Sequence, residues 1–481
     1  MDDLIAIPVW ALGLIGMFAA IAITDRIILP LARAYLAMRR ERAVEALNNK
    51  LALPIAPFKL ARRRALISQL MLDPAVQSAI LAQAQQSGEP VRKVERRAER
   101  YAREIIPAFS ATLYFHVGTR MARSLSTALY RVRVGASDVQ TLQDISPGSA
   151  VVFVINHRSN MDYVLVTYLA ARSSALSYAV GEWARLPGLA TLIRSMGAYF
   201  IRRGSGNVLY RRVLARYVHI ATASGVTQAI FPEGGLSRDG RLQPARLGLL
   251  NYMVADFDPG GPRDIVFVPV GLNYDRVLED RVLLGAASDV EAGLRPRFAF
   301  RLTAFAGFVG RMITARLLGR WYRNGYACVS FGAPLSLRRY VTERQLDFRT
   351  QAEAQRNLAI AALGDTLMEG VGRAIPALPV GLVATALLRA GAQPISTLEL
   401  KLAVARLMAD LRQMGGQVFV PRADEEYAVD VGLRLLVLRR LVIDTDGIVQ
   451  IAPGQDAVLR YYANATAHLT TVAQPSVTQA A

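Results

Sequence analysis

His157 and Asp162 are the residues of this chain whose types and spacing suggest catalysis. Residues 151–163 read VVFVINHRSNMDY, so an apolar run ends in a polar turn that holds one of only four histidines. A carboxylate that accepts from one ring nitrogen fixes the tautomer and raises the basicity of the other nitrogen. Such a histidine can act as a general base toward a hydroxyl group. The alternative interpretation is an ordinary strand end, since a His–X4–Asp pair often arises by chance.

The pair can form only if two different elements present its members. A separation of five residues is a rotation of ~140° in an α-helix, so the two side chains would diverge on one helix. We therefore expect His157 in a strand-to-helix turn and Asp162 in the first turn of the helix. The sequence fits, because VVFVIN is a typical strand, Ser159 or Asn160 can cap a helix, and MDYVLVTYLA continues it.

Three more polar segments follow apolar runs. GAYFIRRG ends in Arg202 and Arg203, for which a solvated surface pair is the alternative interpretation. IFPEGGLSRDGRL places Glu233 in a rigid turn whose glycines let backbone amides approach an anion, while Arg238 offers a fork for phosphate. The third segment follows IVFVPV, a run that contains Pro269. Because proline is hard to accommodate in a central strand, we expect Pro269 near an edge of the sheet or an end of its strand.

The order of these patterns predicts an α/β fold. From residue 148 short β-branched or aromatic runs alternate with helical patterns, which is typical of a mixed, mostly parallel sheet with covering helices. Ligands of such sheets bind outside the carboxyl ends of the strands, where all four polar segments fall. The expected divisions are a transmembrane anchor, a helical N-terminal region, the α/β catalytic domain, a mainly helical C-terminal domain and a tail, at residues 1–26, 27–147, 148–345, 346–470 and 471–481.

The C-terminal domain contains one hairpin-like piece, RRLVIDTDGIVQIAP, whose Asp-Gly is a tight-turn signal. Helices followed by a hairpin also occur in winged-helix DNA binders, but an analogy of fold alone is weak support for that function.

The charge of the chain predicts a polyanionic partner. Lys+Arg 57 against Asp+Glu 38 gives a formal net charge of +19, and all but four of the cations are arginines. Such a surface suits nucleic acid or an anionic membrane. The single cysteine, Cys328, excludes an intrachain disulfide and a cysteine-based zinc cage, and it agrees with a cytosol-facing location.

The N-terminus favours the membrane. Residues 4–24 carry no charge over 21 positions. That length can cross a hydrocarbon core of ~30 Å. Asp2 and Asp3 disagree with a cleaved signal peptide, and the arginines that follow the run predict a cytoplasmic flank. We expect a single-pass anchor with the catalytic domain in the cytoplasm, in bacteria at the inner membrane. A buried core helix is the alternative.

Together the four segments resemble the glycerolipid acyltransferase superfamily. NHRSNMD, GAYFIRR, FPEGGLSR and IVFVPV are similar to its four sequence blocks and occur in the same order. The branch that transfers an acyl group to position 1 of glycerol 3-phosphate is the most similar. The features that carry this likeness are the Arg-Ser after His157, the arginine pair, the run SRDG, the run YDR and the C-terminal LRYYANATAHLT. The likeness covers about residues 90–470.

The resemblance implies a reaction and a set of site residues. His157 would deprotonate the acceptor hydroxyl and Asp162 would orient it. The acyl donor would be acyl-CoA or acyl-carrier protein, and backbone amides near the turn would bind the oxyanion. No metal and no redox cofactor is implied, and the reaction would be the first step of phospholipid biosynthesis. The expected substrate-binding residues are Arg202, Arg203, Glu233, Gly234, Ser237, Arg238 and Pro269.

Two alternatives remain open. Leu236 stands where the family usually has an arginine, so Arg238 would need help from Arg202, Arg203 or Arg241, or the acceptor would be lysophosphatidate or another lipid hydroxyl. A membrane-tethered, non-catalytic protein that binds nucleic acid or lipid would explain the charge but leaves the four ordered blocks unexplained. We expect anionic membrane lipids, and no nucleic acid, as partners. His116, His219 and His468 are interpreted as packing or surface residues.

Overall fold

The computed structural model of the chain describes residues 29–135, 145–146, 148–171, 174–181, 189–202, 206–291, 323–391 and 393–470, with positions 14, 17, 18, 23, 24, 26 and 314. It divides into two compact units, Met1–Pro54 and Ile55–Ala481, which are described separately.

The first unit contains helix α2, Leu29–Asn48. Most of the expected anchor at residues 1–26, and all of the expected tail at 471–481, lie outside the described residues. Within the described part of the chain, no single helix has the length and apolar character needed to cross a bilayer. One bent pair, Arg63–Met71 with Pro74–Ser87, meets that criterion when its two helices are taken together.

The second unit begins with the helices that the sequence predicted. They are α3 (Pro57–Leu60), α4 (Arg63–Met71), α5 (Pro74–Ser87), α6 (Val91–Ile105), a π-helix at Leu113–Gly118 and α7 (Thr119–Leu129). Asp73 caps α5 by accepting from the amide of Ala75 at 2.9 Å. The helix ends at Gly88, whose φ of 67° is a left-handed conformation that glycine adopts without strain. This residue separates α5 from α6.

A mixed, mostly parallel sheet forms the centre of this unit, as predicted. Its strand order is β1-β7-β6-β2-β5-β3-β4, with β8 paired to β6. All pairs are parallel except β6–β7 and β6–β8. The strands are β1 (Arg131–Val134), β2 (Ala150–Ile155), β3 (Ser177–Val180), β4 (Tyr199–Phe200), β5 (Gln228–Ile230), β6 (Ile265–Tyr274), β7 (Tyr326–Phe331) and β8 (Leu335–Ser336).

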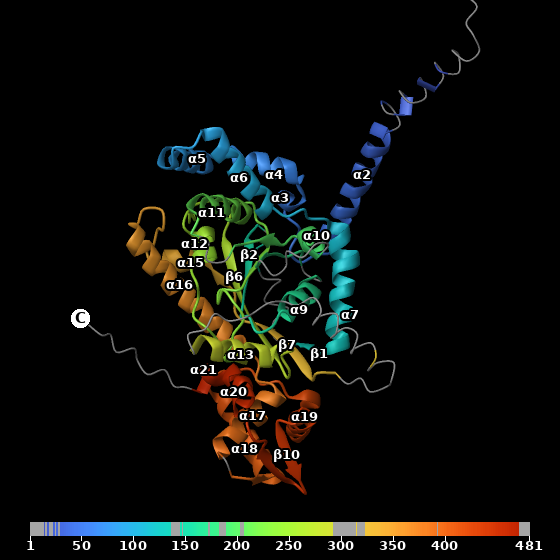
Figure 1. Cartoon of the computed structure of the whole chain (residues 1–481), viewed down its shortest axis with the longest axis vertical. Coiled ribbons are helices and arrows are strands. Elements are labelled where there is room, and N and C mark those ends of the chain that lie inside the picture. The colour runs from blue at the N-terminus through green and yellow to red at the C-terminus, as the bar shows by residue number, and fades with distance from the viewer. Residues whose placement is uncertain are drawn as a thin grey trace, which may run out of the picture. The chain divides into compact units, whose positions relative to one another are not determined.

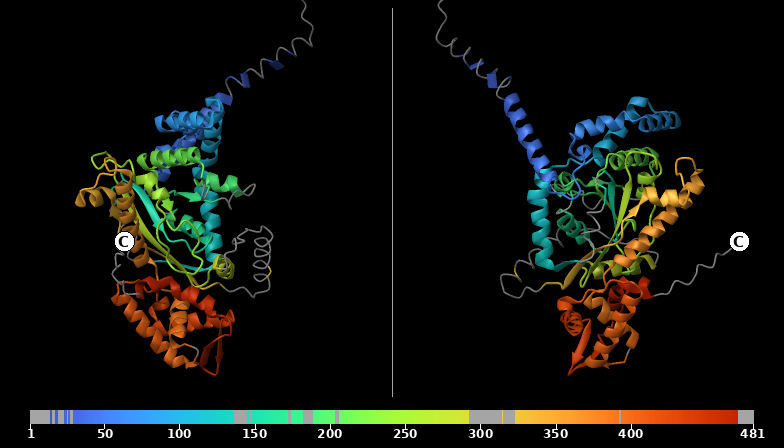
Figure 2. Two further views of the ribbon diagram at one scale, coloured as in Figure 1. Left: turned by 60° about the vertical axis from the view of Figure 1, so that its left-hand side comes forward. Right: turned by 180° about the vertical axis from the view of Figure 1, so that it is seen from behind.

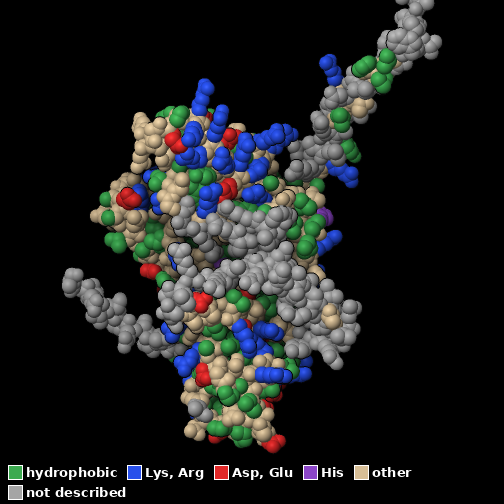
Figure 3. Space-filling model, viewed as in Figure 1, with side chains coloured by type: hydrophobic (Ala, Val, Ile, Leu, Met, Phe, Trp, Pro, Cys, Tyr) green, Lys and Arg blue, Asp and Glu red, His purple; other side chains and the backbone are tan. Residues whose placement is uncertain are grey.

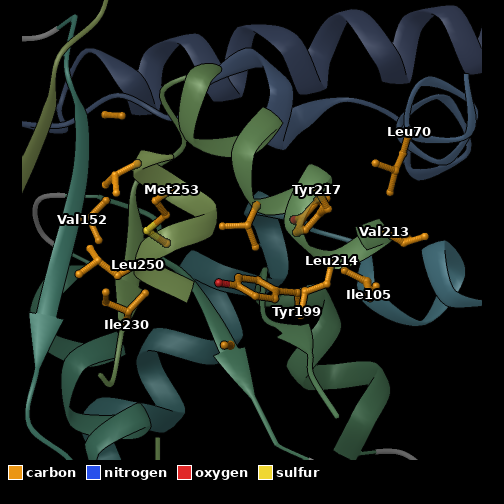
Figure 4. Packing of buried hydrophobic residues seen from close by; sticks show 14 of the residues in the cluster. Leu70, Ile105, Val152, Tyr199, Val213, Leu214, Tyr217, Ile230, Leu250 and Met253 are labelled. Carbon is orange, nitrogen blue, oxygen red and sulfur yellow. The ribbon is translucent and has the colours of Figure 1, made fainter. Parts of the chain in front are cut away.

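Helices cover the sheet in the two layers seen in Figures 1 and 2. Helices α11, α12 and α16 pack with β2 and β6 in one apolar cluster, and α7 packs against α9. Figure 4 shows part of that cluster, where Val152 and Ile230 of the sheet face Leu250 and Met253 of α12. The helices of this part are α9 (Met161–Ala170), α10 (Leu189–Ser195), α11 (Val208–Ala223), α12 (Gly248–Val254), α13 (Asp280–Glu291), α15 (Leu337–Glu343) and α16 (Glu353–Ala374).

Two predicted boundaries differ from the structure. β1 lies inside the segment predicted to be helical, and it pairs with β7 through residues 131–134. Helix α16 was predicted to open the C-terminal domain, but its apolar residues, including Leu363 and Leu367, belong to the same core as the sheet. The α/β part therefore extends from β1 to the end of α16.

The C-terminal region is mainly helical with one hairpin, as predicted. It contains α17 (Pro379–Ala390), α18 (Thr397–Gln413), α19 (Glu425–Leu438), α20 (Asp456–Ala463) and α21 (Ala467–Thr470), with strands β9 (Ile395–Ser396), β10 (Val442–Thr445) and β11 (Ile448–Ile451). Strands β10 and β11 are antiparallel. Asp446 and Gly447 both have positive φ, at 53° and 80°, which is the backbone that a two-residue Asp-Gly hairpin turn requires.

The prediction for Pro269 was wrong. β6 lies inside the sheet between β7 and β2, and Pro269 pairs with Val154 in the middle of the strand. The carbonyl of Pro269 accepts from the amide of Gly332 at 2.7 Å, so its backbone polar groups face the gap between β7 and β8. Among the described strands, none pairs with β6 at this position on that side, so the missing N–H of Pro269 leaves no hydrogen bond unmade and the central strand tolerates the proline.

Candidate active site

The catalytic turn connects β2 to α9, as the spacing of His157 and Asp162 predicted. His157 follows the strand and Asp162 lies in the first helical turn. Nδ1 of His157 is 2.8 Å from Oδ2 of Asp162, and both side chains are buried, at 2% and 0% exposure. Because a carboxylate only accepts, the proton of this bond is on Nδ1, which leaves Nε2 as the basic nitrogen.

Asp162 is fixed by more than the histidine. Its Oδ2 also accepts from the backbone amides of Arg158 and Ser159, at 2.7 and 3.0 Å. Its Oδ1 accepts from the Tyr274 hydroxyl at 2.7 Å. Burial and the neighbouring Asp162 raise the pKa of Tyr274 well above its ordinary value, so this hydroxyl remains a donor. Sequence reasoning missed Tyr274, although it lies in the YDR run that follows the fourth block.

Aromatic rings surround the imidazole. The ring of His157 is 4.4 Å from that of Phe231 and 5.3 Å from that of Tyr163, between centroids. The Tyr163 hydroxyl is 3.5 Å from Nε2. These contacts restrict the rotation of the imidazole and place one hydroxyl beside its basic nitrogen.

The amides of the turn are already used within the protein. His157 donates to Glu233, Arg158 and Ser159 to Asp162, Asn160 to Glu279, and Met161 to the Ser159 hydroxyl. The expected oxyanion donors, backbone amides of this turn, are therefore not free in this structure. Ser159, predicted as a possible cap, also donates through its hydroxyl to Glu279 at 2.8 Å.

Glu233 connects the first and third blocks. Its Oε1 accepts from the amide of His157 at 2.6 Å, and its Oε2 accepts from the amide of Gln243 at 3.0 Å. Burial raises the pKa of Glu233 to about 7. Each carboxylate oxygen of Glu233 accepts from a backbone amide of a loop, so the structure gives Glu233 a positioning role next to His157.

The third-block loop lies directly on the catalytic turn. The amide of Ser237 donates to the carbonyl of His157 at 2.9 Å, and its hydroxyl donates to the carbonyl of Arg241 at 2.7 Å. Gly234 has a φ of 70°, and a Cβ there would lie 2.5 Å from Cδ of Arg246. Arg238 is exposed and has no hydrogen bond or ion pair with another described residue.

The arginine pair of the second block is only partly described. Arg202 forms a two-pronged ion pair with Glu104, with Nε–Oε1 at 2.9 Å and Nη2–Oε2 at 2.6 Å. Its guanidinium also lies 5.2 Å from the ring centres of both Tyr101 and Tyr210. The side chain of Arg202 thus contacts α6 through Glu104, and none of its hydrogen bonds within the described residues reaches the catalytic turn. Arg203 lies outside the described residues.

Pro269 also lies apart from the polar site residues. Its side chain packs on α16, where a Cβ added to Gly370 would lie 2.9 Å from its Cγ. Of the predicted site, the structure brings together His157, Asp162, Glu233, Gly234, Ser237 and Arg238 on two adjoining loops.

The C-terminal helix α20 completes this region, a contact that sequence reasoning missed. Arg158 is 2% exposed, donates to the carbonyl of Gly240 at 2.9 Å, and lies over the ring of Tyr461. Its Nε and Nη2 have no hydrogen-bond partner among the described residues. Gly240 has a φ of 84°, and a Cβ there would lie 1.9 Å from the carbonyl oxygen of Tyr461. Asn464 donates to the carbonyl of Asp239 at 2.9 Å.

No group of three or more His, Cys, Asp or Glu side chains is arranged to hold a metal ion within the described residues. The thiol of Cys328 is buried, and burial raises its pKa well above its ordinary value. The His157–Asp162 geometry is that of a site that removes a proton from a hydroxyl group.

Comparison with known proteins identifies the class. Residues 136–273 match the family model described as Acyltransferase, and residues 314–480 match the glycerol-3-phosphate acyltransferase C-terminal region. Two parts of the chain thus match acyltransferase family models, in agreement with the resemblance that the four blocks predicted.

Several relatives are named glycerol-3-phosphate acyltransferase. One from Pseudomonas putida is 28% identical over 421 residues, covering 85% of this chain and 49% of the relative. One from Pseudomonas entomophila is 30% identical over 85% of this chain and 49% of its own. This chain thus spans about half the length of these relatives. The solved 1-acyl-sn-glycerophosphate (LPA) acyltransferase PlsC from Thermotoga maritima is 15% identical with a TM-score of 0.28, over 52% of this chain and 77% of that chain.

The raised pKa of Glu233 predicts a pH dependence of stability. Between the ordinary value of 4.5 and about 7, the folded chain binds more protons at this group than the unfolded chain does. The free energy of unfolding should therefore fall as pH rises through that window, by at most about 3 kcal/mol from this group. Urea unfolding at a series of pH values should show a smaller fall for Glu233→Gln. Parallel curves for the two proteins would contradict the assignment.

Tyr274→Phe removes one donor to Asp162 and keeps the ring. We expect kcat to fall about tenfold with little change in KM, because a hydrogen bond to a charged group is lost while substrate contacts remain. Tyr130→Phe is the matched control, since its ring packs on Tyr274 at 5.3 Å but its hydroxyl donates to the carbonyl of Arg276. Steady-state kinetics of both variants tests this. An equal loss in both would show that the effect is not specific to the hydroxyl that donates to Asp162.

Proposed function

We propose that this chain transfers a fatty acyl group from an acyl thioester to the 1-hydroxyl of glycerol 3-phosphate. The observation that carries the proposal is the buried 2.8 Å contact between His157 and Asp162, whose carboxylate has further donors on both oxygens. The matched family models and the names of the relatives support the same reaction.

The chemistry follows from the basic ring nitrogen, Nε2, which faces away from Asp162. Nε2 of His157 takes the proton of the acceptor hydroxyl as its oxygen attacks the thioester carbonyl carbon. The tetrahedral intermediate then collapses, the carbon–sulfur bond breaks, and the imidazolium returns the proton to the leaving thiolate. Asp162 stabilises the imidazolium between the two steps. The Tyr163 hydroxyl, 3.5 Å from Nε2, is a side-chain donor near the developing oxyanion.

The acceptor phosphate is assigned to Arg158 and Arg238. Burying a cation without an anion is costly, and Arg158 is buried with two guanidinium nitrogens that lack a partner among the described residues. Arg238 is exposed on the third-block loop, which contacts the catalytic turn through the Ser237 amide and the His157 carbonyl and through Arg158 and the Gly240 carbonyl. Arg202, another arginine expected to bind the acceptor, forms an ion pair with Glu104 in the structure.

The acceptor assay tests this function. Preparations of the chain should acylate glycerol 3-phosphate faster than lysophosphatidate, and His157→Ala and Asp162→Ala should each lower turnover by several powers of ten, as loss of an orienting carboxylate does at ~10⁴-fold in serine proteases. Both acceptors are offered with both acyl-CoA and acyl-carrier protein, and release of thiol is measured. Consumption of lysophosphatidate alone would favour the second candidate, which Leu236 supports by removing an expected arginine.

Attachment to an anionic membrane is part of the same proposal. The uncharged residues 4–24 support an anchor. Figure 3 shows Lys and Arg side chains gathered over α4, α6 and α11. On α6, Arg92, Arg96 and Arg100 are exposed at four-residue spacing, which places them on one face of the helix. Such a face suits anionic lipid headgroups.

Membrane attachment is tested by fractionation. The chain should stay in the membrane pellet after carbonate washing, and its bulk should resist protease added to intact cells because the basic flank is cytoplasmic. A chain that lacks residues 1–26 is the control and should be released by the wash. Release of the full chain, or its cleavage from outside, would refute the anchor or its orientation.

A further inference from the structure

An open cavity lies where the end of β6 meets the C-terminal helices. Its volume is about 290 Å³, and its walls come from the β6–α13 connection, the start of α13 and the end of α19. The lining residues are Arg276, Leu278, Asp280, Arg281, Val282, Leu438 and Arg439. Arg276 closes the YDR run, and the reaction as proposed gives this arginine no role.

The cavity carries more positive than negative charge. Its three arginines face one carboxylate, Asp280, which is already bound by the Arg439 guanidinium and by the Tyr462 hydroxyl at 2.5 Å. Arg276 donates through Nη1 to Asn324 at 3.0 Å, a neutral partner. The side chain of Arg281 is exposed and makes no hydrogen bond or ion pair with another described residue. Guanidinium groups that are not neutralised by a carboxylate can donate paired hydrogen bonds to phosphate oxygens.

The wall of the cavity is connected to the catalytic turn. Glu279 stands between Leu278 and Asp280 in the chain, and its carboxylate accepts from the Ser159 hydroxyl and from the amide and side chain of Asn160. Residues 276–282 therefore contact the catalytic turn through Glu279 and line the cavity through their other side chains. The cavity is thus close to the reaction but separated from His157 by this segment.

We propose that this cavity binds the phosphate groups at the nucleotide end of coenzyme A, which would make acyl-CoA a donor for this chain. The inference rests on the proposed function. In glycerol 3-phosphate only three carbons span the reacting hydroxyl and the phosphate, so that phosphate must stay on the loops that touch His157. In acyl-CoA the long pantetheine arm separates the thioester from the nucleotide, so its phosphates can occupy a separate site.

The apolar part of the cavity fits the same ligand. Leu278, Val282 and Leu438 line it beside the arginines, and Val282 and Leu438 are exposed at 58% and 46%. A nucleotide presents a flat base next to its phosphates, so these side chains would cover the base while the guanidinium groups bind phosphate oxygens. Figure 3 also shows Lys and Arg side chains on the lower half of the molecule, over the C-terminal helices of Figure 1.

Binding measurements on the purified full chain test the site without relying on turnover. The probes are coenzyme A, its 3′-dephospho form and glycerol 3-phosphate, measured by calorimetry. Arg281→Glu should weaken coenzyme A binding about tenfold or more, since a charge-assisted contact becomes a repulsion. The dephospho form should bind the unaltered chain more weakly, and glycerol 3-phosphate binding should not change. Arg434→Glu is the matched control, because Arg434 is exposed on α19 but does not line the cavity.

The outcomes separate this inference from the proposed function. Unchanged coenzyme A binding in Arg281→Glu, equal weakening in Arg434→Glu, or a selective loss of glycerol 3-phosphate binding would each overturn the assignment. A chain that acylates glycerol 3-phosphate from acyl-carrier protein alone and does not bind coenzyme A would overturn it while the proposed function stands. A chain that binds coenzyme A through Arg281 but acylates no acceptor would overturn the proposed function alone.

Discussion

The Asp162 carboxylate is the interaction on which the site depends. A fully buried carboxylate is costly unless donors surround it, and Asp162 has donors from its own turn, from His157 and from Tyr274 at the end of β6. These donors come from the turn that follows β2 and from the end of β6, and these two strands are neighbours in the sheet. The orientation of the imidazole is therefore set by the register of the sheet, because a shift of β6 would remove the tyrosine from the carboxylate.

The loops around the turn are held by contacts to backbone. Glu233 and Glu279 accept from amides of the turn, and Ser237 donates to the carbonyl of His157. The C-terminal helix α20 adds Tyr461 against Gly240 and Arg158. The catalytic turn thus contacts a region 303 residues further along the chain, where the Tyr461 hydroxyl donates to the carbonyl of Arg158. The region that contains α20 therefore packs against the catalytic turn and the third-block loop as part of the site.

The sequence predicted the local parts of this arrangement. Apolar runs located β2, β4, β5 and β6, because buried strands of a mostly parallel sheet are apolar on both faces. Spacing placed His157 and Asp162 correctly, since both lie on one short turn. β1, with the sequence RVRV, was not predicted because it is short and largely exposed, and β3, β7 and β8 were not predicted either.

Long-range partners could not be predicted in the same way. The pairing of Arg202 with Glu104 spans 98 residues, and that of Tyr274 with Asp162 spans 112. Nothing in the local pattern near Arg202 distinguishes an arginine that binds phosphate from one that a distant glutamate neutralises. Pro269 was misplaced for a related reason, because the gap between β7 and β8 that accommodates it depends on the pairing of strands further along the chain.

Acidic and basic side chains around the site differ in burial, and this difference affects which ligands the site attracts. The carboxyl groups of Glu233, Asp275 and Glu279 are buried and accept hydrogen bonds from backbone amides, and burial raises the pKa of each. These carboxyl groups accept hydrogen bonds from within the protein, and because they are buried they contribute little negative potential at the surface. Arg238 on the third-block loop and Arg281 at the start of α13 are exposed, while Arg158 on the catalytic turn is buried. This strongly basic chain thus has arginines on and around the catalytic turn, where they can attract anionic ligands, while Glu233 and Glu279 hold the backbone of the turn that carries His157.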